Sequence, residues 1–269
     1  MARRRRVGIG NNKGGTGKTT ATVNLAAALA EQGLHALVVD MDPQANATRR
    51  LGLRYDPANP MLTTSEVVAS AVEGIAAQAV VPCDWPEPYR SHISLIPARF
   101  DLENRVAEAG VLGAHQRLAV ALRGADEDVD VTLIDFAPSL GHLTQLGLAA
   151  SDTALCTLEP EYDAVEGALR FRDFITQHGR QLNPNGLDLI GYYVGGVRPR
   201  VGEHEFQLAG LGDTFGAAMV WEPHIPERAA VKDAASSAVP LRQLGTGPAR
   251  EVADRFSKLA QRLVEELAR

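Results

Sequence analysis

RVGIGNNKGGTGKTT, residues 6–20, joins a short apolar run to a glycine-rich loop and then to a helical pattern. In this context the backbone N–H groups of the loop and the positive end of the helix dipole form a site for phosphate. Lys18 is expected to reach the β- and γ-phosphates of a nucleotide, and the Thr19 hydroxyl to ligate Mg²⁺. The nucleotide-binding residues expected in the loop are Gly14, Gly15, Thr16, Gly17, Lys18, Thr19 and Thr20.

Lys13 is a second lysine on the N-terminal limb of the same loop, five residues before Lys18. Two ammonium groups that crowd one nucleotide would repel each other. The residues therefore leave two interpretations open. Either Lys13 points to solvent, or it reaches a phosphate that another molecule holds.

Apolar, β-rich runs alternate with helical patterns along the chain. Strands are expected at residues 6–10, 35–40, 92–98, 129–135, 152–159, 187–194 and 217–223. Helices are expected at residues 18–33, 203–213 and 248–269, and at about 65–78, 101–123 and 163–179. This alternation predicts an α/β fold with a doubly wound, mainly parallel sheet flanked by helices.

Composition indicates an ordinary globular protein. Its net charge of −6 argues against a generally basic surface coated with nucleic acid. The two cysteines, Cys83 and Cys156, stand in unrelated contexts and are expected to be reduced thiols. No run approaches the length of a membrane span, so we expect a cytoplasmic protein without membrane association.

Three motifs resemble those of one family, the ParA/MinD ATPases. KGGTGKTT at 13–20 resembles the family's deviant Walker A motif, KGGxGK[ST]. ALVVDMDPQANAT at 36–48 is similar to its second acidic motif, and VTLIDFAPSLG at 131–141 to its Walker B region. Further blocks of the ParA branch match at 95–102, 159–167 and 224–241. The resemblance implies a P-loop NTPase, with one ParA-type ATPase domain over residues 1–269 that hydrolyses ATP with Mg²⁺.

In that family two subunits sandwich two nucleotides, and the first lysine of the loop crosses to the nucleotide of the other subunit. The resemblance therefore places Lys13 on the ATP across an ATP-bound homodimer. There it would neutralise charge on the transferring phosphoryl group, as an arginine finger does. With Lys18 and Asp40, it makes up the expected catalytic set.

The family's acidic residues map onto the ends of two expected strands. By resemblance, Asp40 orients or activates the attacking water and Asp42 supports a switch-like loop. Asp135 would contact Mg²⁺ directly or through water, alongside Thr19. Phe136 replaces the threonine that usually follows the Walker B aspartate, so a signalling role for that hydroxyl is not expected.

Partition-type members bind DNA without sequence preference, through basic residues in the C-terminal third. Glu227 and Ala230 depart from the family pattern there and remove positive charge, while Arg228 and Lys232 add charge nearby. Two interpretations stay open: a displaced basic patch, or weak or absent DNA binding with the arginines only solvated at the surface. The candidate DNA contacts are Arg198, Arg200, Arg228 and Lys232. The arginine run at residues 3–6 favours a solubilising flank of the first strand over an arm that tracks DNA phosphates.

The function implied by the resemblance is an ATP-dependent DNA segregation ATPase for chromosome or plasmid partition, associated with the nucleoid. Its expected partners are a second copy of the chain, non-specific DNA and a ParB-type centromere-binding protein that stimulates hydrolysis. Two alternatives remain open. One is a ParA-like ATPase that positions a protein cargo, and the other is a nucleotide-dependent regulator with little hydrolysis.

Overall fold

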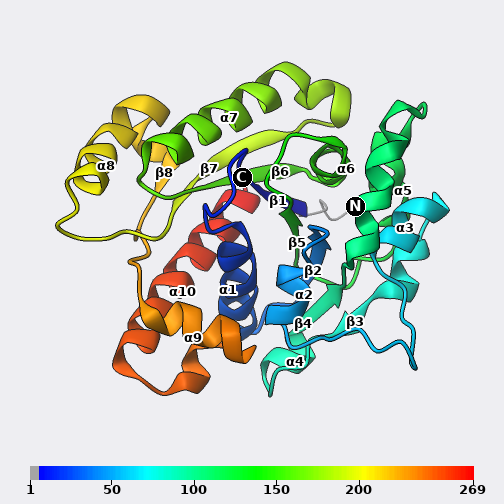
Figure 1. The fold of residues 1–269 in the computed structure, drawn as a ribbon, viewed down its shortest axis with the longest axis horizontal. Helices are drawn as coiled ribbons and strands as arrows, with labels where there is room; N and C mark the ends of the chain where they lie inside the picture. Colours follow the sequence, from blue (N-terminus) through cyan, green and yellow to red (C-terminus); the bar gives the residue numbers. More distant parts are fainter. Residues whose placement is uncertain (1–5) are drawn as a thin grey trace.

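The computed structural model describes residues 6–269, in which an eight-stranded sheet carries helices on both faces (Figure 1). The strand order is β3-β4-β2-β5-β1-β6-β7-β8. The strands are β1 (Arg6–Gly10), β2 (Ala36–Met41), β3 (Val81–Pro82), β4 (Ile93–Ile96), β5 (Val131–Phe136), β6 (Thr153–Leu158), β7 (Asp188–Val194) and β8 (Val220–Trp221). β3 pairs antiparallel with β4, and all other pairings between these strands are parallel. The predicted doubly wound, mainly parallel sheet is confirmed.

Helices cover the sheet in two layers. The α-helices are α1 (Lys18–Glu31), α2 (Asn46–Arg50), α3 (Thr64–Ser70), α4 (Tyr89–His92), α5 (Arg117–Ala121), α6 (His142–Ala150), α7 (Tyr162–Leu182), α8 (Gly202–Phe215), α9 (Ala229–Ser237) and α10 (Gly247–Leu267). The 3-10 helices are η1 (Ile75–Ala79), η2 (Phe100–Gly110), η3 (Ala114–Gln116), η4 (Ala217–Met219) and η5 (Leu241–Leu244). α1 and α10 lie together on one face, and α6 and α7 cover the other (Figure 1).

Each layer encloses its own apolar core. Every residue of β1, β2, β5 and β6 is buried, as expected for parallel strands covered on both faces. The apolar stripe of α10, which includes Phe256 and Leu263, is buried with α1 against this sheet, as its three- and four-residue spacing predicts. None of the described helices is long and apolar enough to cross a membrane.

Glycines and one strained alanine divide two expected helices into shorter elements. The pattern at 65–78 gives α3 and then η1, because Ala71 (φ 51°) and Gly74 (φ 77°) take left-handed conformations between them. The pattern at 101–123 gives η2, η3 and α5, interrupted at Gly113 with φ 73°. Both single-helix predictions were wrong.

Candidate nucleotide-binding site

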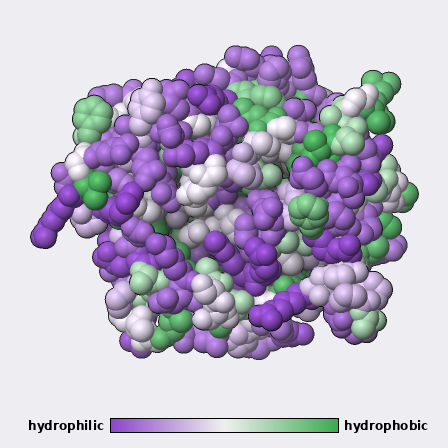
Figure 2. Space-filling model, in the orientation of Figure 1, coloured by the Kyte–Doolittle hydropathy of each residue, from purple (hydrophilic) through white to green (hydrophobic). Residues whose placement is uncertain are grey.

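The site lies where the carboxyl ends of β2, β5, β1 and β6 meet along one edge of the sheet. These four strands are adjacent and parallel, so the loops that follow them converge. Ligands of doubly wound sheets bind at such an edge, where strand order reverses. The face drawn in Figure 2 is dominated by hydrophilic side chains.

The loop between β1 and α1 turns at two glycines. Gly15 and Gly17 have φ angles of 80° and 81°, which other residues rarely adopt. Gly17 precedes α1, and no side chain caps that helix. The space beside Gly15 is open. The free amides at the start of α1 can therefore meet a phosphate at close range.

Asn11 anchors this loop to the neighbouring elements. Its Nδ2 donates to the carbonyl oxygens of Thr157 (2.6 Å) and Ala164 (3.2 Å), and its Oδ1 accepts from the Lys13 amide (2.9 Å). The Thr16 hydroxyl lies 3.2 Å from that of Thr157. Sequence reasoning missed Asn11, because one amide after an apolar strand carries no distinctive signal.

Lys18 is buried and curls back over its own loop. Its Nζ donates to the Lys13 carbonyl at 2.8 Å. Burial lowers the pKa of Lys18, and the nearby Asp135 carboxylate partly opposes that shift. An ammonium with one carbonyl partner in a dehydrated loop can bind a polyanion strongly.

Asp135 is the second-last residue of β5 and is fully buried. Its Oδ2 accepts from the Thr19 hydroxyl at 2.7 Å, and its Oδ1 from the Thr22 hydroxyl at 3.0 Å. Burial, and then the charge of Asp40, raise the pKa of Asp135. A bound cation would relieve both effects. Thr22 was not singled out from the sequence.

The Thr19 hydroxyl and the Asp135 carboxylate form a hydrogen-bonded pair at the start of α1. Their oxygens are hard ligands of the kind that Mg²⁺ prefers. No cluster of three or more His, Cys, Asp or Glu side chains that could hold a metal occurs within residues 6–269. A Mg²⁺ ion here would therefore take its other ligands from phosphate and water, as it commonly does.

Asp40, the second-last residue of β2, is also fully buried. Its Oδ2 accepts from the amide (2.8 Å) and hydroxyl (2.7 Å) of Thr48, and its Oδ1 from the Asp42 amide (3.2 Å). Burial raises the pKa of Asp40, and the Thr48 bonds oppose this shift. The carboxylate is thus held in one orientation by α2, a role for Thr48 that the sequence did not indicate.

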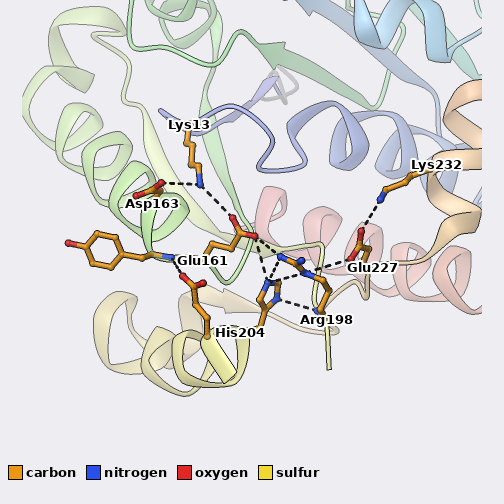
Figure 3. A network of polar contacts seen from close by, with 9 residues as sticks. Lys13, Glu161, Asp163, Arg198, His204, Glu227 and Lys232 are labelled. Carbon is orange, nitrogen blue, oxygen red and sulfur yellow. Dashed lines mark hydrogen bonds and ion pairs between the residues drawn. The ribbon is translucent and has the colours of Figure 1, made fainter. Parts of the chain in front are cut away.

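Lys13 points away from its own loop toward the start of α7 (Figure 3). Its Nζ lies 3.6 Å from carboxylate oxygens of both Glu161 and Asp163. The Lys13 side chain remains 31% exposed. Neither of the two sequence interpretations included this local acidic partner.

A pocket of about 350 Å³ continues from the loop toward α9. Gly17, Thr20 and Arg50 line its end beside α1, and Tyr193, Ile225 and Pro226 line it further on. Three of the four candidate DNA contacts, Arg198, Arg228 and Lys232, also line this pocket and form ion pairs. The pairs are Arg198–Glu161 (2.7 Å), Arg198–Glu227 (3.7 Å), Lys232–Glu227 (2.9 Å) and Arg228–Glu251 (3.6 Å) (Figure 3 shows the first three).

The remaining predicted cations differ from this group. Arg200 is exposed, has a φ of 65°, and takes part in none of the ion pairs within residues 6–269. Arg6 is buried and bonds Asp126 at 2.5 Å, so it is neither a solubilising flank nor a DNA-tracking arm. Residues 3–5 lie outside the described part of the chain.

The glycine loop at a helix start, the buried lysine and the hydroxyl–carboxylate pair define a P-loop nucleotide-binding protein. Comparison with known proteins is consistent with this class. The family model described as "AAA domain" matches residues 4–187. The chromosome-partitioning ATPase Soj of Thermus thermophilus is 34% identical over 263 residues, covering 98% of this chain and 96% of the relative. The chain therefore belongs to the ParA/MinD family of P-loop ATPases.

Solved structures share the fold and hold the expected kind of ligand. Cobyrinic acid a,c-diamide synthase from Mycobacterium smegmatis, with a bound ATP analogue and magnesium, is 29% identical with a TM-score of 0.78. That match covers 99% of this chain and 96% of the synthase. A variant of Cyanothece McdA in complex with ATP has a TM-score of 0.83 over 97% of this chain and 96% of its own. At 22% identity, the latter likeness shows the fold alone.

Proposed function

We propose that this protein is an ATP-dependent DNA segregation ATPase of chromosome or plasmid partition. The observation that carries the proposal is the similarity to Soj over 98% of this chain and 96% of that relative. Because the similarity covers nearly the full length of both proteins, it supports the full ATPase cycle of a ParA-type protein for this chain. In that cycle ATP drives sandwich dimerisation, the dimer binds nucleoid DNA, and a ParB-type partner stimulates hydrolysis that releases it.

The loop and its neighbours would hold Mg²⁺–ATP. The amides of residues 14–20 would surround the phosphates, with the Lys18 ammonium on the β- and γ-oxygens. Thr19 and Asp135 would hold Mg²⁺, which when bound offsets the phosphate charge. The open space at Gly15 and the single carbonyl partner of Lys18 support this placement.

Asp40 would orient and deprotonate the attacking water. A buried carboxylate with a raised pKa is a better general base than an exposed one, provided that it stays ionised. The bonds from Thr48 and Asp42 help to keep it ionised and fixed. Its neighbour across the sheet is Asp135, so the water site would adjoin the metal site.

Lys13 would act on the nucleotide of the partner subunit in a deviant Walker A homodimer. Its amine lies at the surface and is held by two ion pairs of 3.6 Å. Pairs of that length at a half-exposed position contribute about 1 kcal/mol or less. Exchanging these carboxylates for a phosphate brought by a second subunit would therefore cost little.

Arg200 is the strongest candidate for non-specific DNA contact, since it is exposed and carries no ion pair among the described residues. Arg198, Arg228 and Lys232 would each have to exchange a carboxylate for a DNA phosphate. We therefore propose that Arg200 contributes more to DNA affinity than any of these three.

The test is ATP-dependent retention of DNA at low salt, measured with ATPase activity for the wild type and four variants. Lys13→Ala should lose retention and hydrolysis, whereas Asp40→Ala should keep retention and lose hydrolysis. Arg200→Ala should lose retention only, with a shallower salt dependence by about one counterion. The matched control is Arg180→Ala, an exposed arginine at the far end of α7, which should change neither.

Failure of the wild type to retain DNA with ATP would contradict the partition proposal and favour a protein cargo. A wild type that binds ATP without turnover, even with its partner, would instead favour a nucleotide-dependent regulator. Equal losses in Arg200→Ala and Arg180→Ala would show that DNA contact is not localised at Arg200.

A further inference from the structure

Arg50 is a half-buried cation at the junction between the phosphate loop and the pocket. It is the last residue of α2, and its carbonyl accepts from the Trp85 indole at 3.0 Å. Its Nη1 donates to the Thr20 hydroxyl at 3.0 Å. The guanidinium is thus fixed in place beside the first turn of α1.

Arg50 differs from the other cations of the pocket in having no carboxylate partner. Arg198, Arg228 and Lys232 all form ion pairs. None of the ion pairs within residues 6–269 includes Arg50. Arg6, a more deeply buried arginine, bonds both oxygens of Asp126. Arg6 thus has a full counter-charge, which Arg50 lacks among the described residues.

The local electrostatics favour an anion next to Arg50. Burial lowers the pKa of its guanidinium, and the distant attraction of Asp135 opposes this only in part. Both Asp135 oxygens are already engaged by Thr19 and Thr22. An arginine with one neutral hydroxyl as side-chain partner can still form a bidentate contact with phosphate.

We propose that Arg50 binds the α-phosphate of the nucleotide. The position follows from the order of residues along α1. Lys18 and Thr19 serve the β- and γ-phosphates and Mg²⁺, and Thr20 is the next residue toward the pocket. Because Arg50 contacts Thr20 and lines the pocket end nearest the loop, the phosphate that joins the loop to the nucleoside is the one within its reach.

This inference rests on the proposed placement of the nucleotide in the loop and adds a residue specific to one phosphate. An α-phosphate contact is present with AMP, ADP and ATP alike, and is absent with adenosine. A contact to the γ-phosphate would be lost with ADP, one to the β-phosphate would be lost with AMP, and one to the base or ribose would persist with adenosine.

The experiment measures the affinities of ATP, ADP, AMP and adenosine for the full chain with Mg²⁺, in wild type, Arg50→Met and Arg50→Gln. Loss of a charge-assisted contact to the α-phosphate should weaken binding of ATP, ADP and AMP by the same factor, about tenfold or more, and leave binding of adenosine unchanged. Arg50→Gln keeps a donor but no charge, so it should show the same loss. Arg49→Met is the control, because Arg49 is the exposed neighbour on α2 and bonds Asn46 instead.

Three outcomes would overturn the inference. They are an equal loss for adenosine, a loss for ATP or ADP that is absent with AMP, and full recovery of affinity in Arg50→Gln. Unfolding of the variants in urea separates a folding defect from a binding defect, and Arg50→Lys should regain part of the ADP affinity if charge is what matters. Failure of the wild type to bind ATP would reject the proposed nucleotide site itself, which is a distinct result.

Discussion

Gly167 sets how closely α7 approaches the phosphate loop, and replacing it with alanine should displace that loop. A Cβ atom at this position would lie 2.4 Å from Asn11 Oδ1 and 3.1 Å from the Cβ of Lys13. The Asn11 amide cannot rotate away freely, because it donates to Thr157 and Ala164 and accepts from Lys13. The added methyl must therefore move either the helix or the loop.

Three contributions, two destabilising and one stabilising, set the change in the free energy of unfolding of Gly167→Ala. Overpacking by one methyl costs about 1–3 kcal/mol. Loss of one buried hydrogen bond of Asn11 adds about 1 kcal/mol. Alanine in place of glycine inside a helix returns about 1 kcal/mol. We expect Gly167→Ala to lower the free energy of unfolding by about 1–3 kcal/mol, and to weaken ATP binding because the loop shifts.

Gly210→Ala is the matched control, since Gly210 lies inside α8 and a Cβ there would meet no atom within 4 Å. It should raise the free energy of unfolding by about 0.5–1 kcal/mol. Urea unfolding without ligand gives both values, and a titration with ATP gives the affinities. The reasoning would be refuted if Gly167→Ala were as stable as Gly210→Ala and bound ATP like the wild type.

Three further predictions concern the Asp40 carboxylate, its hydrogen-bond partner Thr48 and the core residue Phe136. Thr48→Val removes the hydroxyl that donates to the buried Asp40 carboxylate and should therefore lower kcat by about tenfold or more. Thr48→Ser keeps that hydroxyl and should have a kcat near that of the wild type. Equal kcat values for the two variants would contradict this prediction. Burial raises the pKa of Asp40, so its contribution to stability is present at low pH and lost as pH rises through the folded-state pKa. Asp40→Asn should therefore gain stability relative to wild type between pH 5 and pH 8, by about 1–2 kcal/mol in nucleotide-free urea unfolding, and a constant difference would argue against it. The buried ring of Phe136 fills the space beside Gly8 and Gly147. Phe136→Leu should therefore lower the free energy of unfolding in urea by about 1–2 kcal/mol. An unchanged free energy of unfolding would show that the core relaxes around the smaller side chain.

Much of the fold could be predicted because apolar strands and amphipathic helices leave a periodic signal. The seven expected strands are all present, and the expected C-terminal helix corresponds to α10. The short helices α2 and α4 were missed, and so were α6 and α9. All residues but one of α6 are buried, so it has no polar face and no helical period to detect. β3 was missed because it is only two residues long.

The candidate site was predictable only where chemistry follows a local motif. The loop lysine, its threonine and the two strand-end aspartates lie together as expected, because adjacent parallel strands end at one edge. Contacts between distant segments had no such signal. The ion pairs of Lys13 and Arg198 with Glu161 depend on how α7 and the segment after β7 fold beside the loop, which no short pattern specifies.

α2 lies between the pocket and the carboxylate that is proposed to activate water. Thr48 bonds Asp40 from one side of this helix, and Arg50 reaches Thr20 and the pocket from its end. A helix of five residues is too short to be stable by itself, so its position depends on such contacts. A phosphate bound by Arg50 would add a contact at one end of α2 and thereby restrict Thr48 at the other. The proposed phosphate contact of Arg50 therefore predicts that occupation of the pocket and the orientation of Asp40 are linked, because Thr48 and Arg50 belong to the same short helix.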